Sequence, residues 1–147
     1  MDKLDSLLAL EAIRTLKAQY FRFVDSKNWA ALGELFAVDA HFDIRDDVPE
    51  GGLLRGRAPI MALITAGLTG LTSVHHGHEH EVELLSATSA RGICAMEDKL
   101  WWPKESASPL QHLHGYGHYF EDYALIEGRW QIKSLRLKRL RVYARGR

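Results

Sequence analysis

The sequence contains one cysteine, four prolines and no long hydrophobic run. The single Cys94 excludes an intramolecular disulfide, and its apolar surroundings favour a small buried side chain over a nucleophile. No window holds the ~20 apolar residues that a membrane-spanning helix needs. Residues 1–5 lack the basic start and apolar block of a signal peptide. We therefore expect a cytoplasmic protein that does not enter the membrane.

The chain also lacks an excess of charge of either sign, because 19 basic residues balance 19 acidic ones. No long-range attraction of nucleic acid or of an anionic membrane is expected from such a balance. Basic residues crowd the C-terminus from Arg136 to Arg147, a pattern typical of a solvated strand and tail. With 46% hydrophobic residues and no repeat or linker, residues 1–147 predict one globular domain.

Helical patterns occupy the first half of the chain. Residues 5–26 predict an amphipathic helix, residues 29–37 a second helix with Asn28 as its N-cap, and residues 57–67 a third. The stripe of the first helix contains Ala9, Ile13, Leu16, Tyr20, Phe23 and Val24. Residues 40–45 alternate as a short strand with Phe42 and Ile44 on one side. Two glycines and a proline predict a loop at residues 46–56.

The second half is rich in β-branched and aromatic residues between turn signals. It predicts strands at residues 71–80, 81–85, 90–102, 112–126 and 130–143, with a hairpin turn at Glu127-Gly128. Helices followed by a run of strands indicate the α+β class. We expect a strongly curved, antiparallel or mixed sheet that wraps around the long first helix as an open-ended cone, with two shorter helices.

Four histidines fall within six positions, at residues 75, 76, 78 and 80. On a strand, His76, His78 and His80 would share one face and His75 would point to the other. One interpretation is a transition-metal site on the shared face, although ligands ~6.6 Å apart along a straight strand converge only if it bends, which Gly77 would allow. Another is that His75 alone acts as a general acid or base. A third is that these are surface histidines.

Asp98 supports the acid–base interpretation, because it is a carboxylate within an apolar stretch of the next strand and could pair with His75 across the sheet. Tyr20 lies on the inward stripe of the first helix. Asp25 follows five residues later, about 140° further around a helix, so the two converge only if the helix ends near Val24. Arg139 lies between leucines in the last strand and is either a buried anion partner or part of the basic tail.

The strand at residues 112–126 alternates between polar and small or aromatic side chains. Tyr116 and His118 lie on the polar face, and periodicity leaves open which face lines the cone. Gly115 and Gly117 would allow a close approach or a kink. We take Tyr116 and His118, together with His76 and Phe42, as candidate substrate contacts.

Several segments resemble a known family over nearly the whole chain. They are LEAIRTLKAQYFRFVD at 10–25, SVHHGH at 73–78, MED at 96–98, GYGHY at 115–119 and GRWQI at 128–132. The chain resembles SnoaL-like proteins of the nuclear transport factor 2-like superfamily, most of all the bile-acid dehydratase and scytalone dehydratase branch. The resemblance implies an α+β cone, commonly a trimer or dimer, with a pocket at its open end and no metal or organic cofactor. His76, His80 and His118 depart from the branch.

The family's functional positions fall on Tyr20, Asp25, His75, Asp98 and Arg139. The resemblance implies a lyase, either a dehydratase or a retro-aldol-type enzyme, acting on a small hydrophobic, aromatic or alicyclic hydroxylated substrate. His75 oriented by Asp98 would remove a proton, and Tyr20 assisted by Asp25 would polarise a carbonyl or protonate a leaving hydroxyl. Arg139 would hold developing oxyanion charge or a substrate carboxylate. The alternatives are an isomerase, an epoxide hydrolase or a non-catalytic binding module.

Overall fold

The computed structural model describes all residues from 1 to 147. Three helices precede or interrupt the early strands, and the last four strands follow one another directly. The elements are α1 (Lys3–Asp25), α2 (Trp29–Glu34), β1 (Phe36–Asp43), β2 (Leu53–Arg55), α3 (Arg57–Leu68), β3 (Thr72–Leu84), β4 (Ser89–Trp101), β5 (Leu110–Ile126) and β6 (Arg129–Gly146).

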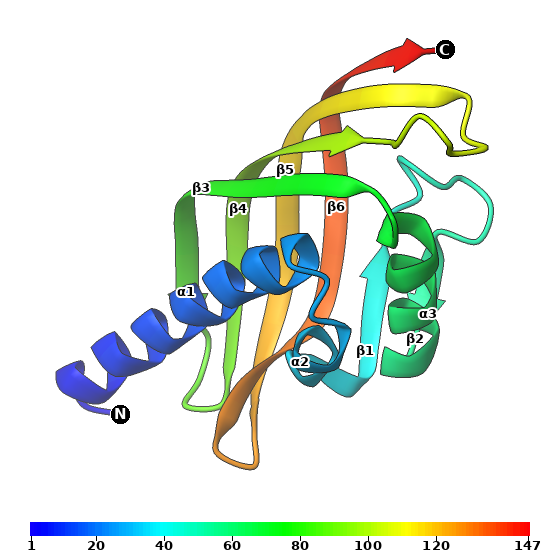
Figure 1. Cartoon of the computed structure of the whole chain (residues 1–147). Helices are drawn as coiled ribbons and strands as arrows, with labels where there is room; N and C mark the ends of the chain where they lie inside the picture. The colour runs from blue at the N-terminus through cyan, green and yellow to red at the C-terminus, as the bar shows by residue number, and fades with distance from the viewer.

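The six strands form one mixed sheet in the order β2-β1-β6-β5-β4-β3. Only the contact between β1 and β6 is parallel, and all other neighbours are antiparallel. The strands β3, β4 and β5 each bend between an upright lower part and a nearly horizontal upper part, so the sheet is strongly curved (Figure 1). Helix α1 crosses the concave side of the sheet, and α3 lies next to β1 and β2. The predicted α+β cone is therefore confirmed.

Helix α1 has a side-chain cap at its start and a residue with positive φ just after its end. The Asp2 side chain caps its start by accepting a hydrogen bond from the Asp5 amide at 2.8 Å. The predicted apolar stripe is buried at Ile13, Leu16, Tyr20 and Val24. The helix ends at Asp25, and Lys27 then adopts a positive φ of 59°. Because the helix stops there, the Asp25 side chain is free to turn toward the sheet.

The close approach of α1 to β3 depends on Gly77. A Cβ atom at this position would overlap the Phe21 ring and lie 2.8 Å from Cys94 Sγ, closer than any stable contact. The absence of a side chain therefore lets the helix pack directly onto the strand. This packing sets the distance between the end of α1 and the residues of β3 that face the same cavity.

Some element boundaries differ from the predicted ones. Helix α2 ends at Glu34 and β1 already begins at Phe36, so part of the predicted second helix is strand. The predicted loop at 46–56 contains the short strand β2, which pairs with β1. The two strands predicted at 71–80 and 81–85 are one strand with a bulge between His78 and Glu81, where Glu79 has a φ of 46°. A bulge adds one residue and moves the following side chains to the other face.

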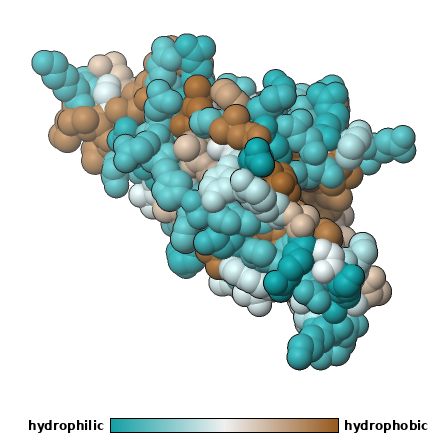
Figure 2. All heavy atoms as spheres, turned by 90° about the horizontal axis from the view of Figure 1, so that it is seen from above, coloured by the Kyte–Doolittle hydropathy of each residue, from teal (hydrophilic) through white to brown (hydrophobic).

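No helix of the structure is long and apolar enough to cross a membrane. Seen from above, hydrophilic side chains cover most of the molecule, and hydrophobic ones gather at the projecting end of α1 and in a band near the middle (Figure 2). Leu4, Leu7 and Leu8 are the exposed leucines of that helix end. The hydrophobic core lies between the rest of α1, α3 and the concave side of the sheet.

Candidate active site

A cavity of about 500 Å³ opens between α1, α3 and the concave face of the sheet. Fifteen of its 21 lining residues are hydrophobic, among them Phe42, Ile44 and Leu113. Its polar groups are the side chains of His75, Asp98, Arg139, Asp46 and Asp47, together with the hydroxyl groups of Tyr20 and Tyr119, which count among the fifteen. An apolar cavity with a few convergent polar groups is the usual form of a small-molecule site.

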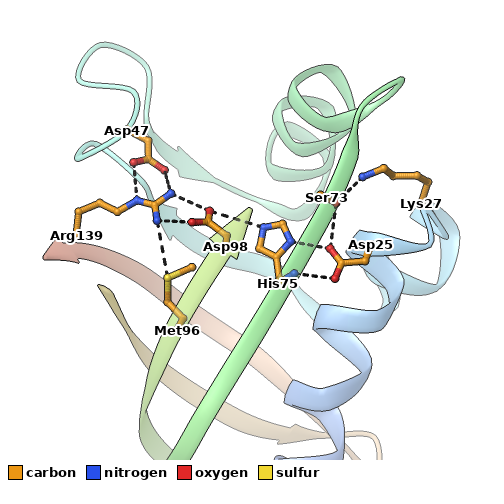
Figure 3. Close-up of polar contacts among 8 residues, drawn as sticks. All are labelled: Asp25, Lys27, Asp47, Ser73, His75, Met96, Asp98 and Arg139. Carbon is orange, nitrogen blue, oxygen red and sulfur yellow. Dashed lines mark hydrogen bonds and ion pairs between the residues drawn. The ribbon is translucent and has the colours of Figure 1, made fainter. Parts of the chain in front are cut away.

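His75 and Asp25 form the central polar contact of this site. His75 Nδ1 lies 2.7 Å from Asp25 Oδ1, and the His75 backbone N–H donates to Asp25 Oδ2 at 2.7 Å (Figure 3). A carboxylate only accepts hydrogen bonds, so Nδ1 carries a proton, and in the neutral imidazole Nε2 therefore presents its lone pair. This partner differs from the predicted one. From the sequence we expect Asp98 to orient His75 and Asp25 to pair with Tyr20, whereas in the structure Asp25 contacts His75.

Asp25 is held by a further chain of donors. The Ser73 hydroxyl donates to Asp25 Oδ1 at 3.0 Å, and Lys27 Nζ donates to Ser73 Oγ at 2.6 Å (Figure 3). An ammonium group can only donate, so Ser73 must accept from Lys27 and direct its own proton to Asp25. Burial lowers the pKa of Lys27, and the nearby charge of Asp25 opposes this shift. Asp25 thus accepts three hydrogen bonds and cannot swing away from His75.

The second nitrogen of His75 faces Asp98 without a hydrogen bond. His75 Nε2 lies 4.0 Å from Asp98 Oδ2, and both side chains are largely buried. The two residues are direct neighbours across β3 and β4, and Asp98 in turn is the neighbour of Gly115 in β5. The predicted proximity of His75 and Asp98 is confirmed, and the space between them belongs to the cavity.

Arg139 does not offer a free donor to the cavity. Its Nη1 and Nη2 donate to the two oxygens of Asp98 at 2.7 and 2.9 Å, and its Nε and Nη2 donate to those of Asp47 at 2.9 and 3.0 Å. The remaining Nη1 hydrogen points to Met96 Sδ at 3.9 Å (Figure 3). Burial opposes the charge, but the hydrogen bonds with Asp98 and Asp47 outweigh it and raise the pKa of Arg139. All five N–H groups are occupied by protein partners, so in this arrangement Arg139 has no N–H group free for the oxyanion or substrate carboxylate that the resemblance implies.

Tyr20 and Tyr119 bring phenols to the same cavity. Their rings pack edge to face with centroids 6.1 Å apart. Burial raises the pKa of Tyr20, and Glu121 raises it further; burial likewise raises the pKa of Tyr119. Both phenols therefore stay protonated near neutral pH and can donate a hydrogen bond or a proton.

Three of the four candidate substrate contacts are not at the cavity. Phe42 lines it, as expected. His76 lies opposite Glu97, and Glu97 lies opposite Tyr116, one position away from the His75–Asp98–Gly115 row that faces inward. Successive strand residues point to opposite faces, so His76 and Tyr116 lie on the outer face of the sheet, and His118 joins them two residues further on. The structure thus settles which face of β5 lines the cone.

The histidine cluster is divided between the two faces. The bulge at Glu79 turns His80 inward, where its Nε2 lies 3.1 Å from the Tyr123 hydroxyl, while His76 and His78 stay outside. His78 and His114 lie 3.5 and 3.7 Å from Glu97 as ion-pair partners. No three His, Cys, Asp or Glu side chains are arranged to hold a metal ion, so the residues do not fit the metal interpretation.

Sequence reasoning missed five polar residues of the site: Lys27, Asp46, Asp47, Ser73 and Tyr119. Ser73 could have been found from strand alternation, because it shares a face with His75, whereas Tyr119 could not, since periodicity leaves open which face of its strand lines the cone. Asp47 lies in the loop between β1 and β2, where no periodicity predicts the direction of a side chain. Its contact with Arg139 spans 92 positions of sequence.

Comparisons with known proteins identify the family and the fold. Residues 5–136 match the family model of the SnoaL-like domain, so the chain belongs to the SnoaL-like family. A candidate scytalone dehydratase from Novosphingobium aromaticivorans superposes with a TM-score of 0.86 at 18% identity, covering 99% of this chain and 93% of the other. The hexachlorocyclohexane dehydrochlorinase LinA-type3 from Novosphingobium barchaimii gives 0.82 at 18% identity, with 98% and 94% covered.

A single-residue variant of Rv3472, a Mycobacterium tuberculosis protein of unknown function, gives a TM-score of 0.75 at 20% identity, with 92% of this chain and 78% of the other covered. At such identities the likeness concerns the fold, which is nuclear transport factor 2-like. Members of this fold include dehydratases and dehydrochlorinases, which are lyases.

Proposed function

We propose that the protein is a lyase that removes a proton and a neighbouring leaving group from a small hydrophobic ring compound. One observation carries the proposal: the Nδ1 of His75 is fixed by Asp25 at 2.7 Å, and its Nε2 faces an apolar cavity with no hydrogen-bond partner. A base with a fixed tautomer and a free lone pair in a water-poor cavity is suited to taking a proton from carbon.

In the proposed step, His75 Nε2 takes a proton from a carbon next to a carbonyl or to the leaving group. The electron pair of the C–H bond becomes the new C=C bond, and the bond to the leaving group breaks. The imidazolium that forms is stabilised by Asp25 at 2.7 Å and by Asp98 at 4.0 Å. Carboxylates on both sides of the ring therefore favour the protonated state that the reaction creates.

The leaving group departs toward the phenols. A hydroxyl receives a proton from Tyr20 and leaves as water, and the tyrosine then regains a proton from the imidazolium through solvent, so substrate gives product plus water. A halide needs no proton and leaves as the ion. Tyr119 is placed to donate a hydrogen bond to the same oxygen or to a substrate carbonyl. The family's dehydratases and dehydrochlorinases differ in this leaving group, which supports a common elimination here.

The test uses two uncharged probes. One is 3-hydroxy-1-tetralone, a bicyclic β-hydroxy ketone whose loss of water yields 1-naphthol and is followed by absorbance. The other is a hexachlorocyclohexane, followed by chloride release. For the probe that is turned over, we expect His75→Ala and Asp25→Asn to lower kcat by about 10²–10⁴-fold. Unchanged turnover in His75→Ala would contradict the assignment of the base.

A second measurement needs no substrate. Nitrogen NMR of labelled protein should show that the neutral His75 imidazole carries its proton on Nδ1 and not on Nε2. A test with a probe separates the isomerase alternative: in D2O, exchange of the probe's C–H without loss of its leaving group would indicate an isomerase instead.

The homo-oligomer, a trimer or dimer, stays a prediction, which sedimentation of the purified protein checks. The cytoplasmic location stays a prediction as well.

A further inference from the structure

The environment of Arg139 bears on which substrates the proposed lyase can accept. Arg139 is the only lysine or arginine that lines the cavity. Its guanidinium is held between Asp98 and Asp47, with four N–H···O bonds of 2.7 to 3.0 Å and a fifth N–H on Met96 Sδ. A guanidinium has five N–H donors, so none is left for a ligand.

The charge of the cavity is also negative without a ligand. Asp46, Asp47 and Asp98 line it as three carboxylates against one guanidinium. Asp46 does not neutralise Arg139 further, because its Oδ2 accepts the backbone N–H of Arg139 at 2.8 Å. Asp25 adds a further carboxylate directly behind His75. An anion entering here meets repulsion from several sides and no free cation.

Other cationic groups near the site do not offset the excess of carboxylates at the cavity. Lys27 is bound to Ser73 on the far side of Asp25 and does not line the cavity. Lys138 and Arg141 lie opposite His118 and Tyr116, on the outer face of the sheet. His75, once protonated, has both nitrogens next to carboxylates, Asp25 and Asp98.

We propose that the pairing of Arg139 with Asp47 and Asp98 makes the cavity select uncharged ring compounds and reject carboxylates and phosphates. The inference deepens the proposed function and rests on it, because it concerns the substrate of the same site. The apolar walls strengthen the selection, since moving an anion out of water without a partner is far more costly than moving a neutral group.

A neutral hydroxyl, in contrast, fits the polar end of the cavity. His75 Nε2 and Asp98 Oδ2 are 4.0 Å apart. Both atoms accept hydrogen bonds when the imidazole is neutral. A ligand hydroxyl at ~2.8 Å from either atom can donate its single hydrogen to it, whereas a carboxylate can donate to neither.

Asp47 is the residue that tests the inference. It lies in the loop between β1 and β2, its side chain is one-third exposed, and its loss frees the Nε hydrogen and one Nη2 hydrogen of Arg139. Asp43 is the matched control, because it pairs with Arg45 through two similar hydrogen bonds and does not line the cavity. Asp47→Ala and Asp43→Ala therefore each remove one arginine-paired carboxylate, only one of them at the cavity.

The probes are 2-naphthamide and 2-naphthoate, which have the same shape and differ in charge. We expect calorimetry at pH 7 to show wild type binding the amide at least about tenfold more tightly. Asp47→Ala should bind the naphthoate about tenfold more tightly than wild type and the amide within about twofold, and Asp43→Ala should match wild type. Equal binding of both probes by wild type, no amide binding, or an unchanged ratio in Asp47→Ala would overturn the inference.

Binding is measured without turnover, so the two proposals fail separately. A protein that prefers the amide but catalyses no elimination contradicts the lyase proposal alone. A protein that dehydrates 3-hydroxy-1-tetralone but binds naphthoate as tightly as naphthamide contradicts the selection against anions alone.

Discussion

Asp25 and His75 are 50 positions apart in the sequence and share two hydrogen bonds of 2.7 Å. One of these bonds uses the backbone N–H of His75, so Asp25 fixes the strand as well as the imidazole. The contact exists because α1 ends at Asp25 while it lies on β3. The end of a helix thus determines the orientation of the candidate base.

Ser73 should affect catalysis through this contact. We expect Ser73→Ala to lower kcat for a turned-over probe by about tenfold with little change in KM, because a charge-assisted hydrogen bond to Asp25 is worth about 1.5–3 kcal/mol. Steady-state kinetics checks this. Ser134→Ala is the control, because the Ser134 hydroxyl donates an equivalent hydrogen bond of 2.7 Å to Asp122, and neither residue lines the cavity. A loss of equal size in both variants would speak against the specific role of Ser73.

Gly115 should be intolerant of a side chain. Its Cβ would overlap Arg139 Nη1 and lie 2.6 Å from Asp98 Oδ1. We therefore expect Gly115→Ala to displace the Asp98–Arg139 pair and to reduce turnover strongly, although the backbone tolerates alanine elsewhere in a strand. The control is Gly33→Ala, whose Cβ would meet only Met61 at an ordinary 3.6 Å. Wild-type turnover by Gly115→Ala would show that the position of the pair does not matter.

Strand alternation explains which parts of the site could be predicted. The predicted proximity of His75 and Asp98 is confirmed, because strand alternation places both residues on the same face of neighbouring strands. The role of Asp25 could not be derived that way, since it depends on where a helix ends against a strand 50 positions later. The sequence leaves open whether Arg139 is a buried anion partner or part of the basic tail, and only its contacts with Asp98 and with a distant loop carboxylate decide for the first.

The fold could likewise be predicted where the local sequence pattern is regular, and the prediction failed where the backbone departs from regular alternation. The long stripe of α1 and the regular patterns of β4, β5 and β6 identify elements whose packing agrees with their local sequence. The bulge at Glu79 has no sequence signal, because a non-glycine residue adopts the positive φ there. That bulge turns His80 inward, so His76, His78 and His80 do not share the one face that regular alternation would give them.

His80 should make the fold sensitive to acid. Burial lowers the pKa of His80 in the folded protein below the ordinary 6.5, with Glu121 opposing the shift. Below pH 6.5 the unfolded chain therefore binds more protons at this residue than the folded protein does. As the pH is lowered from 6.5, the free energy of unfolding decreases until the pKa of His80 in the folded protein is reached. Above pH 6.5 both states are neutral and the effect disappears.

The measurement is urea unfolding between pH 7.5 and 5. We expect His80→Gln to show a smaller loss of stability over this range than wild type. His76→Gln serves as the control, because His76 is exposed on the outer face and should leave the pH dependence unchanged. A wild-type pH dependence in His80→Gln would show that other groups cause the acid sensitivity.

The buried Lys17–Glu121 pair should contribute to stability in a way that depends on both partners. Lys17 is 2% exposed and Glu121 4%, and they form an ion pair beneath the cavity. Lys17 Nζ also lies 3.9 Å from the centre of the Tyr20 ring and 3.8 Å from that of Tyr119. Burial lowers the pKa of Lys17, while Glu121 opposes that shift. Each charge therefore depends on the other to remain in the core.

We expect Lys17→Met to lower the free energy of unfolding by about 3–5 kcal/mol, because it leaves the Glu121 carboxylate buried without its cation. The double variant Lys17→Met/Glu121→Gln should recover at least ~2 kcal/mol of this loss, since the amide is uncharged and still accepts the hydrogen bond from Tyr123. Chemical denaturation measures both, with Lys133→Met as the control because its pair with Asp39 is exposed. If the second substitution adds to the loss, the penalty comes from lost packing around Lys17 and not from an unpaired charge.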